Sequence, residues 1–338
     1  MTVRVGVIGT GWVGRARHIP GFRTHPQVVI AAVYDRRPDR AAGAARASGV
    51  PAWDDDLDRF LSRDLDIVSI ATPPWTHAEL ARSALGRGLH VFTEKPMAMD
   101  LAEARSMVQA AEDAGRLLCV SHNFLYSRSV RKARAFLGAD PDLRYVAGAQ
   151  LSSLRRRLPS WHEELPGGLL FDEMPHLVYL LQHFLGAPLQ VEHVRGARGA
   201  TDAPVEVLLR GARGPGQITM VMDAPVSEWQ VVVVAEHGTV VLDLFRDIAV
   251  RIRPDGAHEP LDILRTSATA MRDHAVGFVA SGSRYVRGRL FWGHDELIGA
   301  FVEAATTGGP SPVPAEEALG VVAVADRVAG ALTRVAEP

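Results

Sequence analysis

The sequence lacks the features that mark secreted, membrane and nucleic-acid-binding proteins. It contains one cysteine, Cys119, so it can form neither an intramolecular disulfide nor a cysteine zinc cluster. No apolar run approaches the ~20 residues of a membrane-spanning helix, and the first residues do not read as a secretory signal. The 37 Lys and Arg against 39 Asp and Glu leave a formal charge of −2, without the basic excess that attracts nucleic acid or anionic membrane. These absences predict a cytoplasmic protein with no nucleic-acid or membrane partner.

What the sequence does contain is a strand–helix alternation over its first part. The 338 residues, 47% of them hydrophobic, suffice for about two domains. Apolar runs predict strands at 3–8, 28–34, 66–71, 90–93 and 117–121, and helical patterns lie at 13–24, 39–48, 76–87 and 100–114. Runs that are apolar on both faces are typical of parallel strands covered by helices. The alternation predicts a doubly wound α/β domain over 1–122.

From about residue 123 the pattern changes to strands that follow one another directly. Helices are predicted at 129–137, 172–185, 295–306 and 315–335, and strands at 145–151, 190–194, 205–209, 217–222, 229–235, 239–244 and 249–252. Successive strands joined by short turns are typical of an antiparallel sheet. We therefore predict an α+β domain over 123–338, with C-terminal helices that can pack back on the first domain.

A glycine-rich loop follows the first predicted strand and opens the first helix. The residues that its G-x-G-x-x-G pattern assigns to a dinucleotide are Gly9, Gly11, Trp12, Val13 and Gly14. Gly9 permits the turn, Gly11 lets the backbone approach a pyrophosphate, and Gly14 lets helix and strand pack closely. Asp35 ends the second strand, 21 residues after Gly14, where an acid is expected to bind the ribose. A glycine turn in a non-binding α/β unit is the alternative.

The residues at the end of the second strand bear on the choice between NAD and NADP. The Asp35 carboxylate repels a 2′-phosphate and favours NAD. Arg36 can stack on adenine or bind a 2′-phosphate, and Arg36 and Arg37 can equally be solvated loop cations. We predict NAD as the cofactor, with NADP possible.

Two further segments lie where open α/β sheets bind ligands, at the carboxyl ends of parallel strands. Glu94-Lys95-Pro96 follows the fourth strand, and a lysine there can stabilise negative charge on a substrate oxygen. The alternative is a surface ion pair. Ala71, Thr72 and Pro74 follow the third strand, with His77 three residues on, and they can line a cofactor groove or cap the next helix.

A third segment, in the predicted second domain, carries a carboxylate and an imidazole. Asp172 and His176 are four residues apart, so a helix puts them on one face, where a carboxylate can orient a general base. Pro175 predicts that His176 lies in a first helical turn and faces a cleft. A surface pair is the alternative. His183 is interpreted as packing, and no third ligand recurs at metal spacing, so no metal is predicted.

Together these motifs resemble the Gfo/Idh/MocA (glucose–fructose oxidoreductase / inositol dehydrogenase) family over residues 3 to about 186. The segments that carry the resemblance are DIVSIATPPWTHAELARSALGRGLHVFTEKPMA at 66–98 and GGLLFDEMPH at 167–176. The resemblance implies a Rossmann domain, then a domain with a large, open, mostly antiparallel sheet. It implies that Gly9, Gly11 and Gly14 hold pyrophosphate and Asp35 the ribose, that Thr72, Pro74 and His77 line the dinucleotide groove, and that Glu94 and Lys95 lie near the nicotinamide.

The resemblance also implies chemistry: Lys95, Asp172 and His176 form the catalytic group of an NAD(P)-dependent oxidoreductase. His176 takes the proton of a secondary hydroxyl on a sugar, inositol or sugar derivative, and Lys95 stabilises the oxygen. The reverse reaction, reduction of a keto-sugar or nucleotide-sugar, uses the same residues, and a non-catalytic dinucleotide sensor is a further alternative. Two departures from the family bear on the substrate. Met174 replaces a frequent glycine, and Leu125 replaces an arginine in the segment that begins at Asn123.

Residues that bind substrate and partner subunits are predicted on weaker signals. Segments that can face the cleft contain Asn123, Tyr126, Arg155, Trp161 and His162. The arginine run 155–157 can bind a phosphate or a nucleotide-sugar diphosphate, or it can be a solvated loop. The unbroken valine run 231–234 predicts a strand covered on both faces, by another subunit or by the chain's own helices. We predict a homodimer or homotetramer through this sheet.

Overall fold

The computed structural model describes residues 2–196, 204–254, 259–289 and 292–334. The chain divides into two compact units. Unit 1 comprises Met1–His122 and His294–Val322, and unit 2 comprises Asn123–Gly293 and Ala323–Pro338. Unit 1 thus contains a segment from near the C-terminus. Each unit is described by itself.

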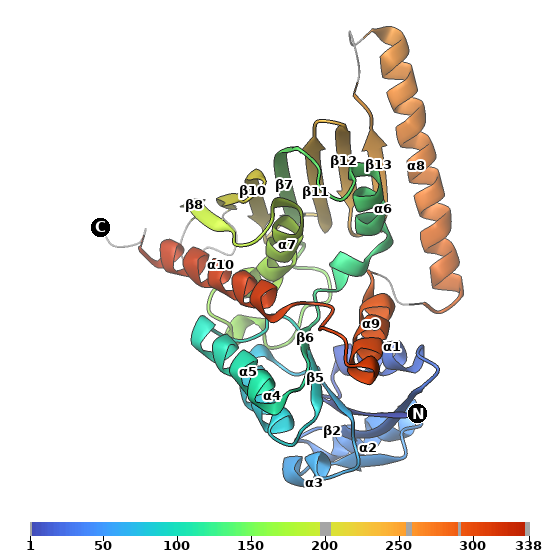
Figure 1. Ribbon diagram of the computed structural model, residues 1–338, viewed down its shortest axis with the longest axis vertical. Helices are drawn as coiled ribbons and strands as arrows, with labels where there is room; N and C mark the ends of the chain where they lie inside the picture. The colour runs from blue at the N-terminus through green and yellow to red at the C-terminus, as the bar shows by residue number, and fades with distance from the viewer. Residues whose placement is uncertain (1, 197–203, 255–258, 290–291, 335–338) are drawn as a thin grey trace. The chain divides into compact units, whose positions relative to one another are not determined.

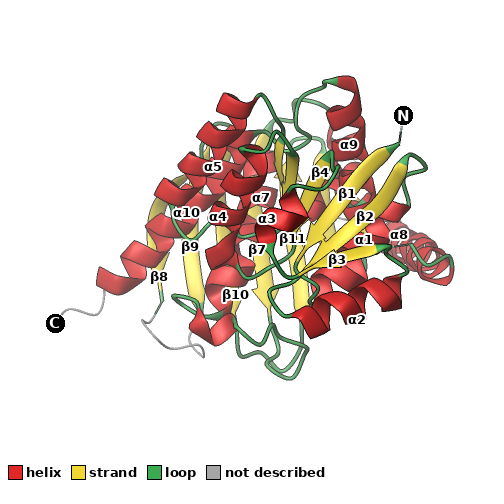
Figure 2. Ribbon diagram, turned by 90° about the horizontal axis from the view of Figure 1, so that it is seen from below, coloured by secondary structure: helices red, strands yellow, loops and turns green. Residues whose placement is uncertain are grey.

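Unit 1 is built on a parallel sheet of six strands in the order β3-β2-β1-β4-β5-β6. The strands are β1 (Val3–Ile8), β2 (Val28–Tyr34), β3 (Ala52–Asp54), β4 (Ile67–Ile70), β5 (His90–Thr93) and β6 (Leu118–Val120). Figure 2 shows β3, β2 and β1 side by side. The order in which successive strands are added to the sheet reverses between β1 and β4, which is the switch point where such sheets bind ligands. This confirms the predicted doubly wound α/β fold.

Unit 1 contains helices between its strands and one further helix, α9, from the segment near the C-terminus. They are η1 (Gly14–His18, one π-helical turn), α1 (Ile19–Arg23), α2 (Pro38–Ser48), α3 (Leu57–Leu61), η2 (Pro74–Thr76), α4 (His77–Leu85), α5 (Leu101–Ala114) and α9 (His294–Thr307). Helix α5 begins at an Asp100 cap that accepts the Glu103 N–H and ends at left-handed Gly115. The short elements β3 and α3 were not predicted, because three to five residues carry too little periodicity.

Unit 2 is built on seven strands in the order β13-β12-β11-β7-β10-β9-β8. They are β7 (Leu143–Leu151), β8 (Gln190–Arg195), β9 (Val205–Gly211), β10 (Gly214–Val221), β11 (Glu228–Ala235), β12 (Gly238–Asp243) and β13 (Ile248–Ile252). All of them except β9 are labelled in Figure 1. The pairings are antiparallel except for β7 with β10, which run parallel. The predicted, mostly antiparallel sheet is confirmed.

Helix α7 (Leu169–Leu185) covers one face of this sheet. The fit is close at Gly148 of β7, where a Cβ atom would lie 3.0 Å from Leu181 and 3.2 Å from Leu177. In β11 the valine run alternates, since Val231 and Val233 are buried while the two valines beside them are partly exposed. The chain's own helices therefore cover one face of this strand and leave the other partly exposed, so that covering of the second face by another subunit stays a prediction.

The other helices of unit 2 are η3 (Asn123–Tyr126), α6 (Arg128–Leu137), η4 (His162–Glu164) and α8 (Pro260–Val286), and α10 (Ala315–Arg334) spans the boundary between the units. Helix α8 was not predicted. It lies beside the edge strand β13, as Figure 1 shows. None of the helices in the described ranges has the length and apolar character needed to cross a membrane.

Candidate functional site

The glycine loop of unit 1 has the geometry of a phosphate-binding cradle. Gly9 has φ +91°, and a Cβ atom there would lie 2.5 Å from the Ala71 carbonyl oxygen. A Cβ atom on Gly14 would lie 2.0 Å from the Gly9 carbonyl oxygen, whereas one on Gly11 would meet nothing within 4 Å. Gly9 and Gly14 are therefore required by packing, and Gly11 leaves its backbone open to a ligand. This loop fits a dinucleotide pyrophosphate.

Asp35, at the end of β2, is held against the same loop. Its Oδ2 accepts the Thr10 hydroxyl at 2.6 Å and the Thr10 N–H at 3.1 Å, and its Oδ1 accepts the Arg37 N–H at 3.1 Å. The carboxylate is thus oriented beside the cradle before any ligand binds. Arg36 is exposed, and the Arg37 side chain pairs with Asp39 at 3.0 Å. Trp12 in the loop is 44% exposed.

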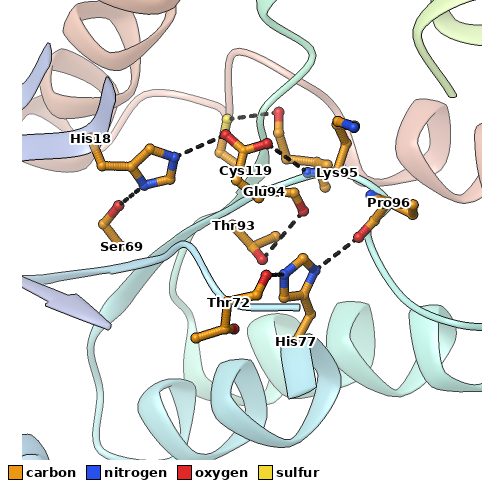
Figure 3. Close-up of polar contacts among 10 residues, drawn as sticks. His18, Ser69, Thr72, His77, Thr93, Glu94, Lys95, Pro96 and Cys119 are labelled. Carbon is orange, nitrogen blue, oxygen red and sulfur yellow. Dashed lines mark hydrogen bonds and ion pairs between the residues drawn. The ribbon is translucent and has the colours of Figure 1, made fainter. Parts of the chain in front are cut away.

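His77 bridges two of the predicted site loops, the one that contains Thr72 and the one that contains Pro96. Its Nε2 lies 2.9 Å from the Thr72 carbonyl oxygen and its Nδ1 lies 2.8 Å from the Pro96 carbonyl oxygen (Figure 3). Since the side chain is fully buried, His77 cannot line the surface of a dinucleotide groove, and that implication of the resemblance is corrected. A neutral imidazole can donate to one of these carbonyls at a time. Burial lowers the pKa of His77, which favours that neutral form.

Pro74 is buried as well, at the first position of η2, while Ala71 and Thr72 are partly exposed. The Thr76 hydroxyl bonds to the Thr72 hydroxyl at 2.7 Å. Of the predicted groove residues after β4, Ala71 and Thr72 are thus the ones with surface to offer a ligand.

A buried chain of polar side chains supports the loop that carries Lys95. His18 Nδ1 lies 2.6 Å from Ser69 Oγ, and His18 Nε2 lies 2.9 Å from Glu94 Oε1 (Figure 3). Glu94 Oε2 in turn accepts the backbone N–H of Lys95 at 3.2 Å. The links join four segments of unit 1: the first helix, β4, the end of β5 and the Lys95 loop.

Glu94 is ionised in this setting although only 12% of its side chain is exposed. Burial by itself raises the pKa of its carboxyl, but His18, His294 and Lys95 together lower it to about 2. A carboxylate that is fixed on two sides holds its neighbours in one geometry, because leaving any of its partners unpaired would be costly. The arrangement orients the peptide of Lys95 and so the start of its side chain.

In unit 2, α7 carries Asp172 and His176 one turn apart. The helix begins at Leu169, so Pro175 is its seventh residue, inside the helix, and the prediction that Pro175 and His176 lie in a first turn is wrong. Helix formation starts earlier because Gly167 and Gly168, with φ +81° and +56°, make the turn that precedes it. His176 is 8% exposed and Asp172 6%, so neither is a surface residue.

The His176 ring lies among aromatic side chains. Its centroid is 4.9 Å from that of Trp229 and 5.2 Å from that of Phe124. Its Nδ1 lies 2.9 Å from Tyr179 Oη, which also accepts the Phe124 N–H at 3.3 Å. Two partners fix the phenol and three rings fix the imidazole, so the histidine is held in one orientation.

A second carboxylate of α7, Glu173, is buried in a polar cluster. It accepts hydrogen bonds from Gln150 and from Ser152 and forms an ion pair with Arg156. The pKa of Arg156 is lowered by burial and raised by the charge of Asp172. Arg156, the middle member of the predicted phosphate-binding run, is therefore part of the support of α7, whereas Arg155 is exposed.

The remaining predicted substrate residues of unit 2 are placed as follows. Asn123 is buried and its Nδ2 donates to the Trp292 carbonyl at 2.9 Å. His162 Nδ1 lies 2.8 Å from the Pro159 carbonyl. Tyr126 and Trp161 are partly exposed. The described residues contain no group of three His, Cys, Asp or Glu side chains arranged to hold a metal ion.

Sequence reasoning missed His18, Ser69, Glu173 and Tyr179 as parts of these sites. His18 and Glu94 are 76 residues apart, and Glu173 and Gln150 are 23 apart on different elements, so no local spacing could pair them. The available signal was a histidine in an otherwise apolar helical face, which indicates burial and hence a polar partner.

Comparison with known proteins identifies an oxidoreductase family over the first part of the chain. Residues 3–122 match the model of an oxidoreductase family with an NAD-binding Rossmann fold. The D-glucoside 3-dehydrogenase of Escherichia coli strain K12 is 32% identical over 195 residues, which cover 55% of this chain and 55% of that protein. The dTDP-3,4-didehydro-2,6-dideoxy-alpha-D-glucose 3-reductase of Actinomadura kijaniata is 29% identical over 197 residues, 56% of this chain and 58% of the reductase. The chain thus matches little more than half the length of these relatives.

The fold of the whole chain recurs in solved structures. The UDP-N-acetylglucosamine 3-dehydrogenase of Acidithiobacillus ferrooxidans superposes with a TM-score of 0.76, covering 99% of both chains at 20% identity. A match at this identity establishes a shared architecture, a Rossmann unit followed by a unit with a large, mostly antiparallel sheet.

Proposed function

We propose that this chain, whose residues 3–122 match the Gfo/Idh/MocA oxidoreductase family, is an NAD-dependent enzyme that interconverts a secondary hydroxyl and a ketone on a sugar or sugar derivative. The observation that carries the proposal is the cradle of unit 1. There Gly9 and Gly14 cannot carry a side chain, Gly11 is open, and Asp35 is already oriented beside them. The nicotinamide, when bound, supplies the hydride acceptor or donor of the reaction.

The catalytic group in this proposal is Lys95, Asp172 and His176, taken over from the family resemblance. His176 removes the proton of the reacting hydroxyl at Nε2 in the tautomer whose Nδ1–H donates to Tyr179. Asp172, one turn away on α7, biases the ring electrostatically or contacts a neighbouring hydroxyl. Lys95 donates to the substrate oxygen and stabilises the negative charge that develops on it.

The polar chain of unit 1 supports this role for Lys95. A lysine has many rotamers, and confining it before substrate arrives lowers the entropic cost of reaction. The bond from the Lys95 N–H to Glu94, with His18 and Ser69 behind it, fixes the backbone from which the lysine extends.

The substrate class is proposed from the relatives. The two curated relatives act, by their names, at position 3 of a glucoside and of a nucleotide-linked deoxysugar. A sugar of either kind accords with the family resemblance. The same proposal includes either direction of the reaction, inositols as further substrates and NADP as an alternative cofactor. It also includes a cytoplasmic location and an oligomer formed through the unit 2 sheet. A division of labour between a dinucleotide-binding domain at 1–122 and a substrate domain at 123–338 belongs to it as well.

A substrate panel tests the proposal. Purified protein is incubated with glucosides, inositols, keto-sugars and nucleotide-sugars, each with NAD and NADP in oxidised and reduced form, and reduced nicotinamide is followed by its absorbance. We expect turnover with a sugar that has a free 3-hydroxyl or a 3-ketone, and with NAD in preference to NADP. Tight NAD binding without turnover on any compound would contradict the enzyme and favour a sensor, and absence of dinucleotide binding would contradict both.

A further inference from the structure

Helix α8 packs its polar and small side chains against its own chain and exposes its apolar side chains, the reverse of what burial of apolar surface would favour. Its 27 residues, about 40 Å of helix at 1.5 Å per residue, pack against β13 with polar and small side chains. Asp273 accepts from Arg251 at 2.7 Å, the Ser281 hydroxyl donates to the Arg246 carbonyl at 2.8 Å, and Gly277 lies against Ile248. The apolar side chains are on the other side of the helix, away from the chain's own core.

These outward side chains follow a strict heptad. Positions separated alternately by three and four residues are occupied by Leu261, Leu264, Ala268, Met271, Ala275, Phe278, Gly282 and Tyr285, and we call these eight residues the α8 seam. All eight are exposed. A 3-4 repeat sustained over more than three heptads is the pattern of a helix that packs along another helix.

The exposure of the seam is large for a chain in water. Leu264 is 65% exposed, Phe278 71% and Tyr285 73%, and Val279 and Val286 on its border are 68% and 84% exposed. Contiguous apolar patches on monomers seldom exceed a few hundred Å². The α8 seam with its border is on the order of the ~800 Å² that each partner buries in a standard interface.

We propose that the α8 seam binds the α8 seam of a second copy of this chain, with the two helices antiparallel. In an antiparallel pair each first heptad position faces a fourth position of the partner helix. Centring the pair on Asp273 makes all eight seam positions meet at once: Leu264 with Gly282, Ala268 with Phe278, Met271 with Ala275, and Leu261 with Tyr285. A single two-fold axis generates each contact twice.

Side-chain size selects this arrangement and this partner. Three of the four layers in the antiparallel pair put a large side chain against Ala or Gly, so every such layer has a similar volume and the helices can approach closely. A parallel pair would stack Phe278 on Phe278 and Ala275 on Ala275, alternating crowded layers with empty ones. The side-chain sizes along the seam therefore match those of a second, antiparallel copy of the same seam. A partner with another sequence would not need this match.

The borders of the seam are compatible with the pairing. Arg265 lies opposite Val279 of the second copy, where its aliphatic stem covers the valine. Arg272 meets its own symmetry mate near the axis, and its charge is already paired with Asp273 in the same chain at 3.1 Å.

The first experiment measures the mass of the wild-type chain and of two seam variants by light scattering over a concentration series. We expect Leu264→Glu and Phe278→Glu to halve the mass of the oligomer and to weaken the association by at least ~30-fold, as loss of a central contact does. Ile263→Glu is the matched control, because Ile263 is 48% exposed on the same helix outside the seam. Circular dichroism checks that each variant remains folded.

The second experiment tests the direction of the pair by disulfide formation. In the antiparallel pair Leu264 and Gly282 face each other, whereas two copies of residue 264 are 18 residues, about 27 Å, apart along the axis. A mixture of Leu264→Cys and Gly282→Cys chains should therefore cross-link under mild oxidation, and neither variant alone should. Cys119 is buried and gives the background in wild type.

Three results would overturn the proposal. The first is a wild-type chain that is monomeric at every concentration. The second is a pair of seam variants whose mass equals that of Ile263→Glu. The third is cross-linking of Leu264→Cys with itself, which would make the pair parallel. An oligomer through the sheet face of unit 2 would survive the seam variants as a smaller assembly, so the two interfaces are told apart. The outcome does not depend on the proposed enzyme activity.

Discussion

The two units hold their candidate chemistry in different kinds of surroundings. In unit 1 the polar groups lie at the ends of neighbouring parallel strands and are joined by hydrogen bonds into one chain, Ser69–His18–Glu94–Lys95. In unit 2 His176 projects from one helix into a group of rings, with the hydroxyl of Tyr179 at its Nδ1. Unit 1 fixes its residues by charge and hydrogen bonding, whereas unit 2 fixes its imidazole mainly by packing.

This difference has a chemical consequence. A carboxylate that is bonded on both oxygens, such as Glu94 with its pKa of about 2, stays charged and keeps its position over the whole physiological range. The imidazole of His176 is held in one orientation by the rings of Phe124 and Trp229 and by the Tyr179 hydroxyl at its Nδ1. The first setting fixes a charged group by its hydrogen bonds, and the second fixes a ring by its packing.

The largest expected effect separates the two settings by function. Lys95→Ala in unit 1 and His176→Ala in unit 2 should each reduce kcat by roughly 10²–10⁴-fold, the usual contribution of an acid–base or charge-stabilising group. Binding of NAD, followed by its fluorescence or by calorimetry, should change far less. Arg134→Ala, at an exposed position of α6 in unit 2 with no assigned role in the site, serves as the control. Near-normal turnover of both catalytic variants on the true substrate would reject the assignment.

A smaller effect is expected from acid, and it should reach both units. Burial lowers the pKa of His122 in unit 1 to about 3 and that of His183 in unit 2 to about 4, against 6.5 for the unperturbed group. Below pH 6.5 the unfolded chain binds protons that the folded chain does not, so stability is complete above that pH and is lost as the pH falls. Amide hydrogen exchange between pH 7 and 5 measures the stability of each unit separately, because each unit has its own protected amides.

The slope should approach ~1.4 kcal/mol per pH unit for His122, which is nearly inaccessible, and less for His183, which is partly solvated. His122→Gln should flatten the slope in unit 1 and His183→Gln in unit 2. Below about pH 4.5 a second loss begins, because the unfolded chain protonates Glu94 and then Asp273, whereas the folded chain keeps both carboxylates ionised down to their pKa of about 2. Equal slopes in wild type and in both variants would contradict the prediction.

The smallest expected effect concerns the packing of the glycine loop. Gly14→Ala puts a methyl group 2.0 Å from the Gly9 carbonyl oxygen, so it should cost about 1–3 kcal/mol of unfolding free energy and weaken NAD binding. Gly43→Ala is the matched control, because a Cβ atom in the middle of α2 meets nothing within 4 Å and should stabilise the helix by up to ~1 kcal/mol. Two variants of equal stability and equal affinity would show that the cradle is not as tightly packed as described.

Much of unit 1 was predictable because its signals are local. A strand, a glycine loop, a helix start and an acid 21 residues later occupy consecutive stretches of chain, and each imposes its own backbone requirement. The positions of Lys95 and Thr72 followed from the rule that parallel strands end at one edge of a sheet. In unit 2 the strands were predictable from alternation, but their order and the parallel pair of β7 with β10 were not, since nothing local encodes a neighbour.

Helix α8 is a long element that was not predicted. Its apolar residues recur with helical spacing, yet its inner face is polar, so the segment does not have the appearance of a helix that covers a core. The prediction that Pro175 lies in the first turn of its helix was wrong because of the residues that precede the helix. A proline favours the first turn of a helix in general, but the glycine pair before Leu169 starts this helix earlier.

By itself the sequence determined the kind of fold and the dinucleotide cradle, because these depend on backbone requirements and residue types within short segments, and its family resemblance supplied the candidate catalytic residues. The tertiary structure decided which partners those residues have. It pairs His18 with Glu94, Tyr179 with His176 and Arg156 with Glu173. It also buries His77 between two backbone carbonyls. Such pairings join groups tens of residues apart, and they form because a polar group that leaves water must find its hydrogen bonds wherever packing brings a partner.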